Sequence, residues 1–145
     1  MKNDNYLDTF STKEKAIHHA HWMNFKYRVA KIISGIISGP DDNYSVCEEI
    51  TAQEMQTTFL DILSNDYTNL TYKQIENLRI DKDPAKPWEE INGLFSTADG
   101  EILRYIIKMK IPLEKLIRYE LASRGHDENH RWCGYEKAKK IWMKK

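Results

Sequence analysis

Three short segments of this sequence have the form of a helix-capping box, in which Ser or Thr stands three residues before Glu or Gln. They read STKE, TAQE and TYKQ, and they begin at Ser11, Thr51 and Thr71. In such a box the first hydroxyl accepts a hydrogen bond from the fourth backbone amide, and the fourth side chain reaches back to the first amide. These helix starts predict an all-α fold, a single compact domain over residues 1–145 with about five to seven helices around one core.

The apolar residues after the first box recur at intervals of three or four positions, from Trp22 to Ile36. This spacing makes one continuous stripe on a helix. We therefore expect a long first helix that runs from the first box to about Ile37. Gly39-Pro40 follows directly and would end it.

The second and third boxes predict two further helices. The helix after the second box ends near Asn65 and has an inner face made of Met55, Phe59, Ile62 and Leu63. The helix after the third box turns Tyr72, Ile75 and Leu78 inward. Residues Tyr44–Val46, between the first two helices, are ambiguous. They can form one short strand or the approach to the next helix, because short apolar runs fit either structure.

Residues 81–87 read DKDPAKP, and two prolines among alternating charges predict a linker. A short helix is expected next, at Trp88–Phe95, with Pro87 near its first turn.

The last third of the chain, Thr97–Lys145, contains two helical patterns in series and a short basic helix at its end. Pro112 separates the first two patterns, because proline inside a continuous helix costs about 3 kcal/mol. Gly125 is expected to end the second helix in the left-handed conformation. An alternative stays open for residues 105–123, where an apolar stretch followed by a helix resembles the layout of ribbon-helix-helix DNA-binding proteins.

The composition is typical of a soluble globular protein, with 41% hydrophobic and 30% charged residues. The longest apolar run, Val29–Ile37, is interrupted by Lys31 and stays well short of the roughly 18 residues that a membrane span requires. The start, MKNDNYLDTF, is too polar for a secretory signal. Because Cys47 and Cys133 are the only cysteines, we expect reduced thiols and a cytoplasmic location.

The net charge is zero, but it is distributed unevenly along the chain. Residues 1–100 hold 10 Lys and Arg against 16 Asp and Glu, and residues 101–145 hold 12 against 6. The chain thus has an acidic front and a basic C-terminal helical module. Such a module is typical of contact with nucleic acid or with an acidic protein surface, although helices also carry charges simply where they face water.

Basic side chains in this module alternate with aromatic ones. That combination suits phosphate contact with base stacking, and it equally suits the hot spots of protein interfaces. The candidate partner-binding residues are Arg104, Lys108, Lys115, Arg118, Arg124, Arg131, Trp132, Tyr135, Lys137, Lys140 and Lys144.

Two groups of histidines have spacings compatible with a metal ion. The first, on the first helix, comprises Glu14, His18 and His21. The second comprises His126, His130 and Cys133, to which Cys47 could add a fourth ligand. Neither group contains the HExxH or CxxC pattern of common zinc sites, so no metal and no cofactor are predicted.

Recognisable catalytic signatures are missing from the sequence, including a glycine-rich phosphate loop, a nucleophile elbow and a complete calcium loop. We therefore expect a small non-enzymatic binding or regulatory protein. It would be an inhibitor, an immunity protein or an accessory factor of phage or mobile-element type, acting through the basic C-terminal face. The alternatives are a nucleic-acid-binding protein that uses the same face and a metal-dependent enzyme. No membrane partner is expected, and an exposed apolar stripe would also support a homodimer.

Overall fold

A computed structural model describes residues 7–61, 63–64 and 66–144. By its internal contacts the chain divides into two compact units, Met1–Ser96 and Thr97–Lys145. This division is not a test of independent folding, so the single domain expected over residues 1–145 stays a prediction.

The first unit is built around a small antiparallel sheet of three strands, β1 (Asp8–Phe10), β2 (Ser34–Ser38) and β3 (Tyr44–Glu48). β3 lies in the middle and pairs with both of its neighbours. The all-α prediction is therefore wrong, because the described residues combine seven α-helices with this three-stranded sheet. β3 includes Tyr44–Val46, where the sequence left a strand open, whereas β1 and β2 were not expected.

β2 stands where the sequence predicted the end of the first helix. That helix, α1 (Lys13–Lys26), ends earlier, and the chain then turns to Lys31, which has a positive φ of 60°. Asn24 joins α1 to the start of β2, since its side-chain oxygen accepts from Ser34 N at 2.7 Å and its Nδ2 donates to Ser34 O at 3.2 Å. A strand that is covered on both faces carries consecutive apolar residues, and such a run also contains the spacing of a helical stripe. For this reason β2 was mistaken for the end of the first helix.

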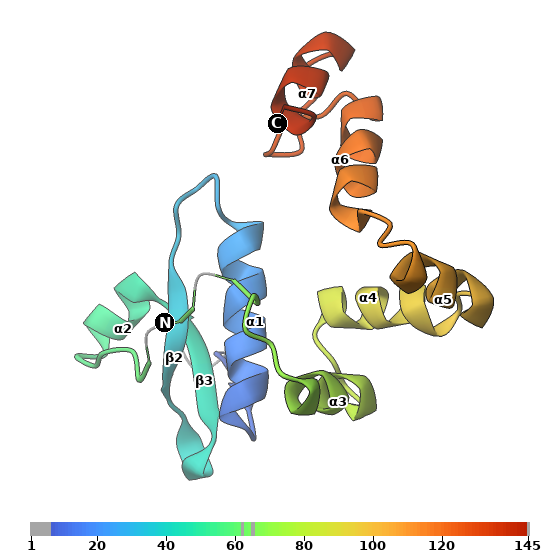
Figure 1. Cartoon of the computed structure of the whole chain (residues 1–145). Helices are drawn as coiled ribbons and strands as arrows, with labels where there is room; N and C mark the ends of the chain where they lie inside the picture. Colours follow the sequence, from blue (N-terminus) through green and yellow to red (C-terminus); the bar gives the residue numbers. More distant parts are fainter. Residues whose placement is uncertain (1–6, 62, 65, 145) are drawn as a thin grey trace. The chain divides into compact units, whose positions relative to one another are not determined.

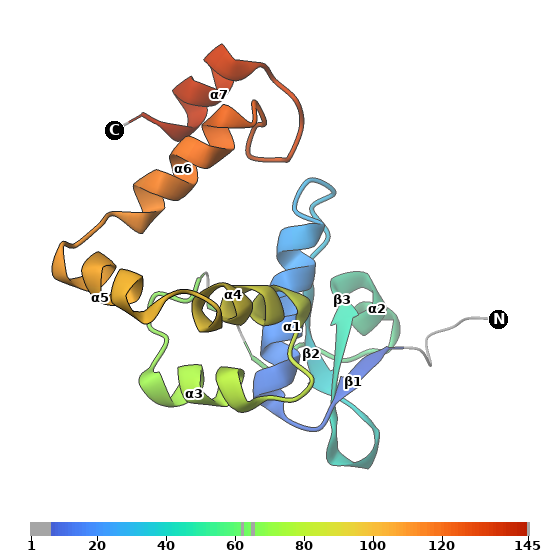
Figure 2. The same cartoon turned by 90° about the vertical axis from the view of Figure 1, so that its right-hand side faces the viewer.

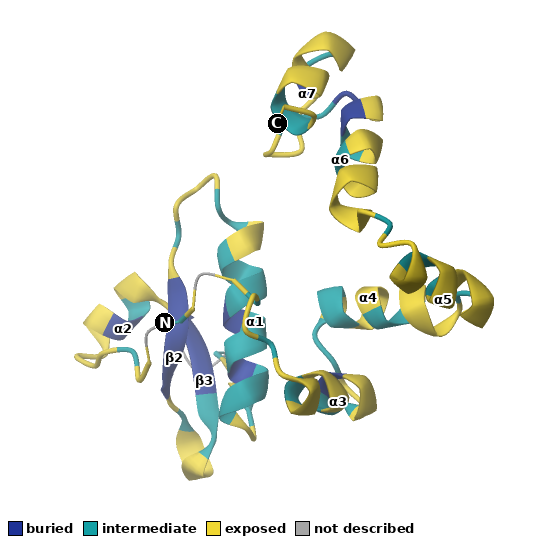
Figure 3. Cartoon of the chain, viewed as in Figure 1, coloured by how far each residue is buried: buried dark blue, intermediate teal, exposed yellow. Residues whose placement is uncertain are grey.

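Helices cover the sheet on both of its faces, with α1 on one side and α2 (Glu49–Glu54) on the other (Figure 1). Successive side chains of a strand point to opposite faces, so neighbouring isoleucines of β2 enter different cores. One cluster contains Ala16, Ala20, Ile36 and Val46, and the other contains Ile37, Cys47 and Ala52. Buried residues of this unit are accordingly concentrated in β2 and β3 (Figure 3).

The second predicted helix is much shorter than expected. α2 has Glu48 as its N-cap, so Thr51 lies inside the helix and the capping box predicted there is wrong. The chain leaves the helical conformation at Gln56, which has a positive φ of 57°. Ile62 and Asn65, which were expected in the last turn of this helix, lie outside the described residues.

The segment after α2 returns to the sheet and packs along β2. The ring of Phe59 lies against Gly35, where an added Cβ would stand only 2.5 Å from the ring carbons. Leu60 N donates a hydrogen bond to Ile36 O at 2.8 Å. Gly35 is therefore required for the close approach of an aromatic ring.

The capping box at Thr71 is confirmed, and it begins α3 (Tyr72–Ile80). The Thr71 hydroxyl accepts from Gln74 N at 3.2 Å, and Gln74 Oε1 accepts from Thr71 N at 2.8 Å. α1 is capped by Thr12 instead of Ser11, with the Thr12 hydroxyl accepting from a backbone amide at 3.2 Å. The predicted helix start is therefore correct at Thr71, and at the first box it is wrong by one residue.

α3 and α4 (Lys86–Ser96) complete the first unit and lie next to each other (Figure 2). The predicted linker is irregular over residues 81–85, and α4 begins at Lys86 rather than at Trp88. Asn92 Nδ2 donates to Leu78 O at 3.2 Å and so connects the two helices. Leu78 is buried, as the sequence predicted, but Tyr72 and Ile75, which were predicted to face inward with it, are 90% and 38% exposed.

The second unit is helical in its described part and contains α5 (Gly100–Lys108), α6 (Leu113–Ser123) and α7 (Tyr135–Trp142). Pro112 is the N-cap of α6, and Gly125 follows that helix with a φ of 71°, so both predicted helix boundaries are confirmed. The ribbon-helix-helix alternative is wrong, because the proposed ribbon lies within α5 and the turn that follows it.

α6 and α7 pack together through the last tryptophan of the chain. Trp142 Nε1 donates to His126 O at 2.7 Å, and Arg118 donates to Trp142 O at 3.2 Å. Among the described residues of this unit, those classed as buried are Ala122, Gly125 and Ala138. The buried residues of this unit are therefore small, while many of its larger apolar side chains remain exposed.

Candidate functional site

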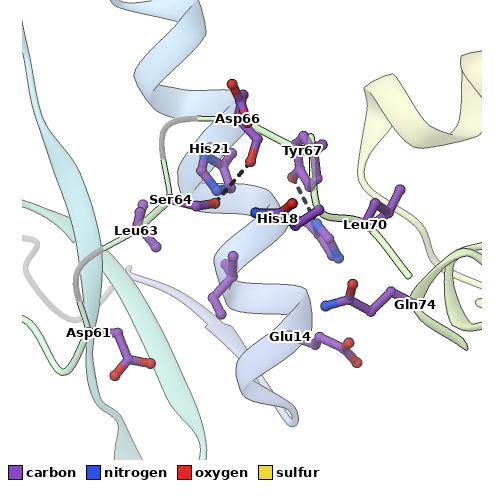
Figure 4. Close-up of a pocket in the computed structure, with 12 residues that line it drawn as sticks. Glu14, His18, His21, Asp61, Leu63, Ser64, Asp66, Tyr67, Leu70 and Gln74 are labelled. Carbon is purple, nitrogen blue, oxygen red and sulfur yellow. Dashed lines mark hydrogen bonds between the residues drawn. The ribbon is translucent and has the colours of Figure 1, made fainter. Parts of the chain in front are cut away.

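A pocket of about 510 Å³ opens between α1 and the segment that leads into α3, entirely within the first unit. Its walls combine apolar side chains with carboxylates, imidazoles, hydroxyls and amides. The lining residues are Glu14, Ile17, His18, His21, Asp61, Leu63, Ser64, Asp66, Tyr67, Asn69, Leu70 and Gln74. Figure 4 shows the α1 side chains in the middle, with Asp61 and Leu63 on one side and Tyr67, Leu70 and Gln74 on the other.

An aromatic cluster forms one wall of this pocket. His18 Nδ1 and the Tyr67 hydroxyl are 2.8 Å apart and share a hydrogen bond, and the two rings are stacked with centroids 5.5 Å apart. The His21 ring lies 5.0 Å from the Tyr67 ring, so both histidines face the same side of α1, as their three-residue spacing predicts. Trp88 of α4 meets Tyr67 edge-on at 5.4 Å.

Burial determines the charge state of this wall. It lowers the pKa of His18, against the opposing effect of the nearby Glu14 carboxylate. It also lowers the pKa of His21 and raises that of the Tyr67 hydroxyl. Both imidazoles and the phenol are therefore neutral near pH 7, since in each case desolvation disfavours the charged form.

The three carboxylates of the pocket have different partners. Asp61 forms an ion pair of 2.6 Å with Lys13. Asp66 accepts hydrogen bonds from the backbone and side chain of Thr68, which lower its pKa. Glu14 is half-buried, and it forms no hydrogen bond or ion pair with any residue in the described ranges.

A metal site was considered at both groups of histidines. In the part of the chain that the structure describes, no group of three or more His, Cys, Asp or Glu side chains is arranged to hold a metal ion. The His126 and His130 rings lie 4.9 Å apart, but Cys133 Sγ is directed to the backbone oxygen of Gly134 at 3.6 Å. Cys47 is buried in the sheet of the first unit, where burial raises its pKa.

The predicted partner-binding arginines of α5 and α6 are paired within their own helices. Each meets a glutamate one turn before it, and the distances are 2.6 Å for Arg104 with Glu101, 2.9 Å for Arg118 with Glu114 and 2.8 Å for Arg124 with Glu120. These are exposed pairs, and such pairs are worth at most about 1 kcal/mol. They nevertheless reduce the positive charge that α5 and α6 present to a partner.

The remaining predicted basic residues are exposed and form no ion pair with a described residue. They are Lys108, Lys115, Arg131, Lys137, Lys140 and Lys144. Lys108 lies with Ile102 and Tyr105 along a shallow groove on α5. These unpaired lysines are most frequent on α7 and directly after it, although the charges of Arg131 and Lys137 also act on Asp127 and help to lower its pKa.

Trp132 and Tyr135 lie together before and at the start of α7, with ring centroids 5.2 Å apart. The inner edge of the Trp132 ring lies against Gly125, where an added Cβ would stand 2.4 Å from it. The indole is still 63% exposed, so it presents an aromatic face near the lysines of α7. That the eleven predicted residues bind a partner remains a prediction.

Sequence reasoning identified His18 and His21 but missed Tyr67, Asp66 and Trp88 as their neighbours. The available signal was weak, because Asp66 and Thr68 indicate only a turn that follows the predicted end of a helix near Asn65. Comparisons of the chain with protein-family models, with curated proteins and with solved structures found no match. None of the described helices has the length and apolar character that crossing a lipid bilayer requires.

Proposed function

We propose that the protein is a non-enzymatic binding protein of the cytoplasm that acts through residues 97–145 on an acidic protein surface. An inhibitor, an immunity protein or an accessory factor of phage or mobile-element type would work in this way. The role of the eleven basic and aromatic residues named above is to hold that surface.

The observation that carries this proposal is the large apolar surface exposed beside the basic residues. On α5 and α6 the exposed side chains include Ile102, Tyr105, Ile107, Leu116, Ile117 and Tyr119, and Ile107 is 79% exposed. Exposed apolar surface rimmed by charge is typical of protein interfaces. Arg, Tyr and Trp, which this unit also exposes, are the residues most often found at interface hot spots.

The test is recovery of a partner from a cell lysate by the whole chain and by two charge-reversed variants. Replacing Lys137, Lys140 and Lys144 with Glu should abolish recovery. The control replaces Lys82 and Lys86 of the first unit with Glu, and it should recover the partner as the wild type does. Equal recovery by both variants would contradict the proposal.

A second candidate function is nucleic-acid binding, which the exposed Trp132 and Tyr135 beside the lysines of α7 favour. Aromatic rings can stack on bases while lysines contact phosphates. In that case a gel shift with DNA or RNA would weaken steeply as salt rises, because bound phosphates release counterions. A homodimer would instead be seen as a doubled mass in light scattering, with no added partner.

A further inference from the structure

We propose that the pocket that α1 forms with described residues between Asp61 and Gln74 binds a small organic cation, a protonated alkylamine, with Glu14 as its counter-ion. This site belongs to the first unit and is independent of the binding function proposed for residues 97–145. It is supported by the size of the pocket, by its walls and by the distribution of charge around it.

The size and walls of the pocket suit an organic molecule. Its volume of about 510 Å³ lies within the range of about 300–1,000 Å³ found for small-molecule sites. Ile17, Leu63 and Leu70 supply apolar surface for a carbon chain. The half-buried ring of Tyr67, which packs against His18, His21 and Trp88, adds aromatic surface to the wall.

The charge of the lining selects a cation over an anion. Among the described residues that line the pocket, three are carboxylates and none is Lys or Arg, and the two imidazoles are neutral because burial lowers their pKa. Lys13 offsets one carboxylate, Asp61, through their ion pair. The local charge therefore remains negative.

Glu14 is the carboxylate best placed to hold the ligand. Asp61 is already engaged by Lys13, and Asp66 by Thr68, whereas Glu14 has no such partner in the described part of the chain. It stands in the first turn of α1, where the helix dipole stabilises a negative charge. Because Glu14 is partly removed from water and has no such partner, a cationic hydrogen-bond donor would stabilise it more than it would stabilise the two paired carboxylates.

The same pocket is unsuited to a bare metal ion. Its acidic and imidazole groups do not converge on one point, since no metal-holding group of three exists among the described residues. An alkylammonium needs only one carboxylate and an apolar wall, because its charge sits on a single nitrogen at the end of a carbon chain.

The experiment titrates n-butylammonium into the ¹⁵N-labelled whole chain and follows amide chemical shifts. Neutral n-butanol and anionic butyrate are titrated in parallel. We expect saturable shifts around Glu14, His18 and Tyr67 with the amine alone, with a dissociation constant on the order of millimolar for so small a ligand. No saturable shift with the amine, or equal shifts with butanol, would overturn the proposal.

Two variants identify the counter-ion. Glu14→Gln keeps the size of the side chain and removes its charge, and it should weaken amine binding about tenfold, which corresponds to about 1.4 kcal/mol. The control is Glu54→Gln on α2, which does not line the pocket and should bind as the wild type does. Equal affinity in both variants would overturn the role of Glu14.

Unchanged amide spectra outside the pocket show that Glu14→Gln is folded. If Glu14→Gln does not fold, Tyr67→Leu is used in its place and should also weaken binding. A comparison with a capped lysine peptide identifies the source of the amine. Tighter binding of the peptide indicates the lysine side chain of a protein, and tighter binding of the free amine indicates a small metabolite.

Discussion

Shortening the isoleucines of residues 33–37 to alanine distinguishes the strand in the structure from the helix that the sequence predicted. In a helix, Ile33 would lie one turn from both Ile36 and Ile37, and all three side chains would share one face. In β2, Ile36 and Ile37 enter opposite cores and are 1% and 2% exposed, whereas Ile33 precedes the strand and is 54% exposed. The three substitutions therefore have different expected costs in the two arrangements.

The magnitudes follow from burial. Replacing a fully buried isoleucine with alanine costs about 2–5 kcal/mol, which includes lost apolar transfer and the cavity left behind. We expect Ile36→Ala and Ile37→Ala each to lower the free energy of unfolding by about 3 kcal/mol. Ile33→Ala should cost less than about 1 kcal/mol, since half of its side chain is already in water.

The assay is urea unfolding followed through the amide NMR signals of β3, so that the first unit alone is measured. The wild type and the three variants are compared at one pH and temperature. The reasoning is refuted if Ile33→Ala costs as much as Ile36→Ala and Ile37→Ala, because three similar losses are the pattern of one buried helix face.

Three further predictions follow from single contacts. Thr71→Ala removes the confirmed capping box and should destabilise the first unit by about 1 kcal/mol in the same urea assay. The control is Thr51→Ala, because Thr51 lies inside α2 and caps no helix. Equal losses of stability in the two variants would contradict the role of the capping box. Gly125→Ala combines the cost of a positive φ with a clash against the Trp132 ring, whereas at Gly134, where φ is also positive, an added Cβ has open space. Gly125→Ala should therefore lower the thermal stability of the second unit more than Gly134→Ala, as followed by the near-ultraviolet circular dichroism of tryptophan. The reverse order of stabilities would be inconsistent with the packing. Burial holds the pKa of His18 below its ordinary value of 6.5, so the unfolded chain takes up its proton first as pH falls. The stability due to neutral His18 is then complete above about pH 6.5 and is lost as pH drops through the folded pKa; an NMR titration of the imidazole with a midpoint at or above 6.5 would disprove this.

Helix boundaries that depend on neighbouring residues could be predicted from the sequence. The capping box at Thr71 and the glycine end at Gly125 are local, since each involves hydrogen bonds within a few residues along the chain. Pro112 likewise separates α5 from α6 whatever surrounds it. For this reason the helical layout of residues 71–144 was largely correct.

The sheet could not be predicted in the same way. Whether residues 34–38 form a strand depends on β3, α1 and α2 covering both of its faces, and these contacts connect distant parts of the chain. The spacing of Ile32, Ile33, Ile36 and Ile37 fits a helix and a doubly covered strand equally well. Tertiary contacts decided between them, and the sequence does not display those contacts.

The candidate pocket was predictable only in part. The spacing of His18 and His21 placed both on one face of a helix. Their partner Tyr67 stands 49 residues from His18 in the sequence, and no local pattern connects the two. Glu14 was associated with the histidines by spacing, but its lack of a partner required the structure.

The hydrogen bond from Leu60 to Ile36 has a consequence for how the protein behaves when crowded with copies of itself. An uncovered outer strand can recruit the same strand of another molecule and begin a fibril. Here the outer side of β2 already engages Leu60 N, while β1, on the opposite border, is only three residues long. Mutations that detach the segment around Phe59 and Leu60 should therefore cause aggregation before they cause global unfolding.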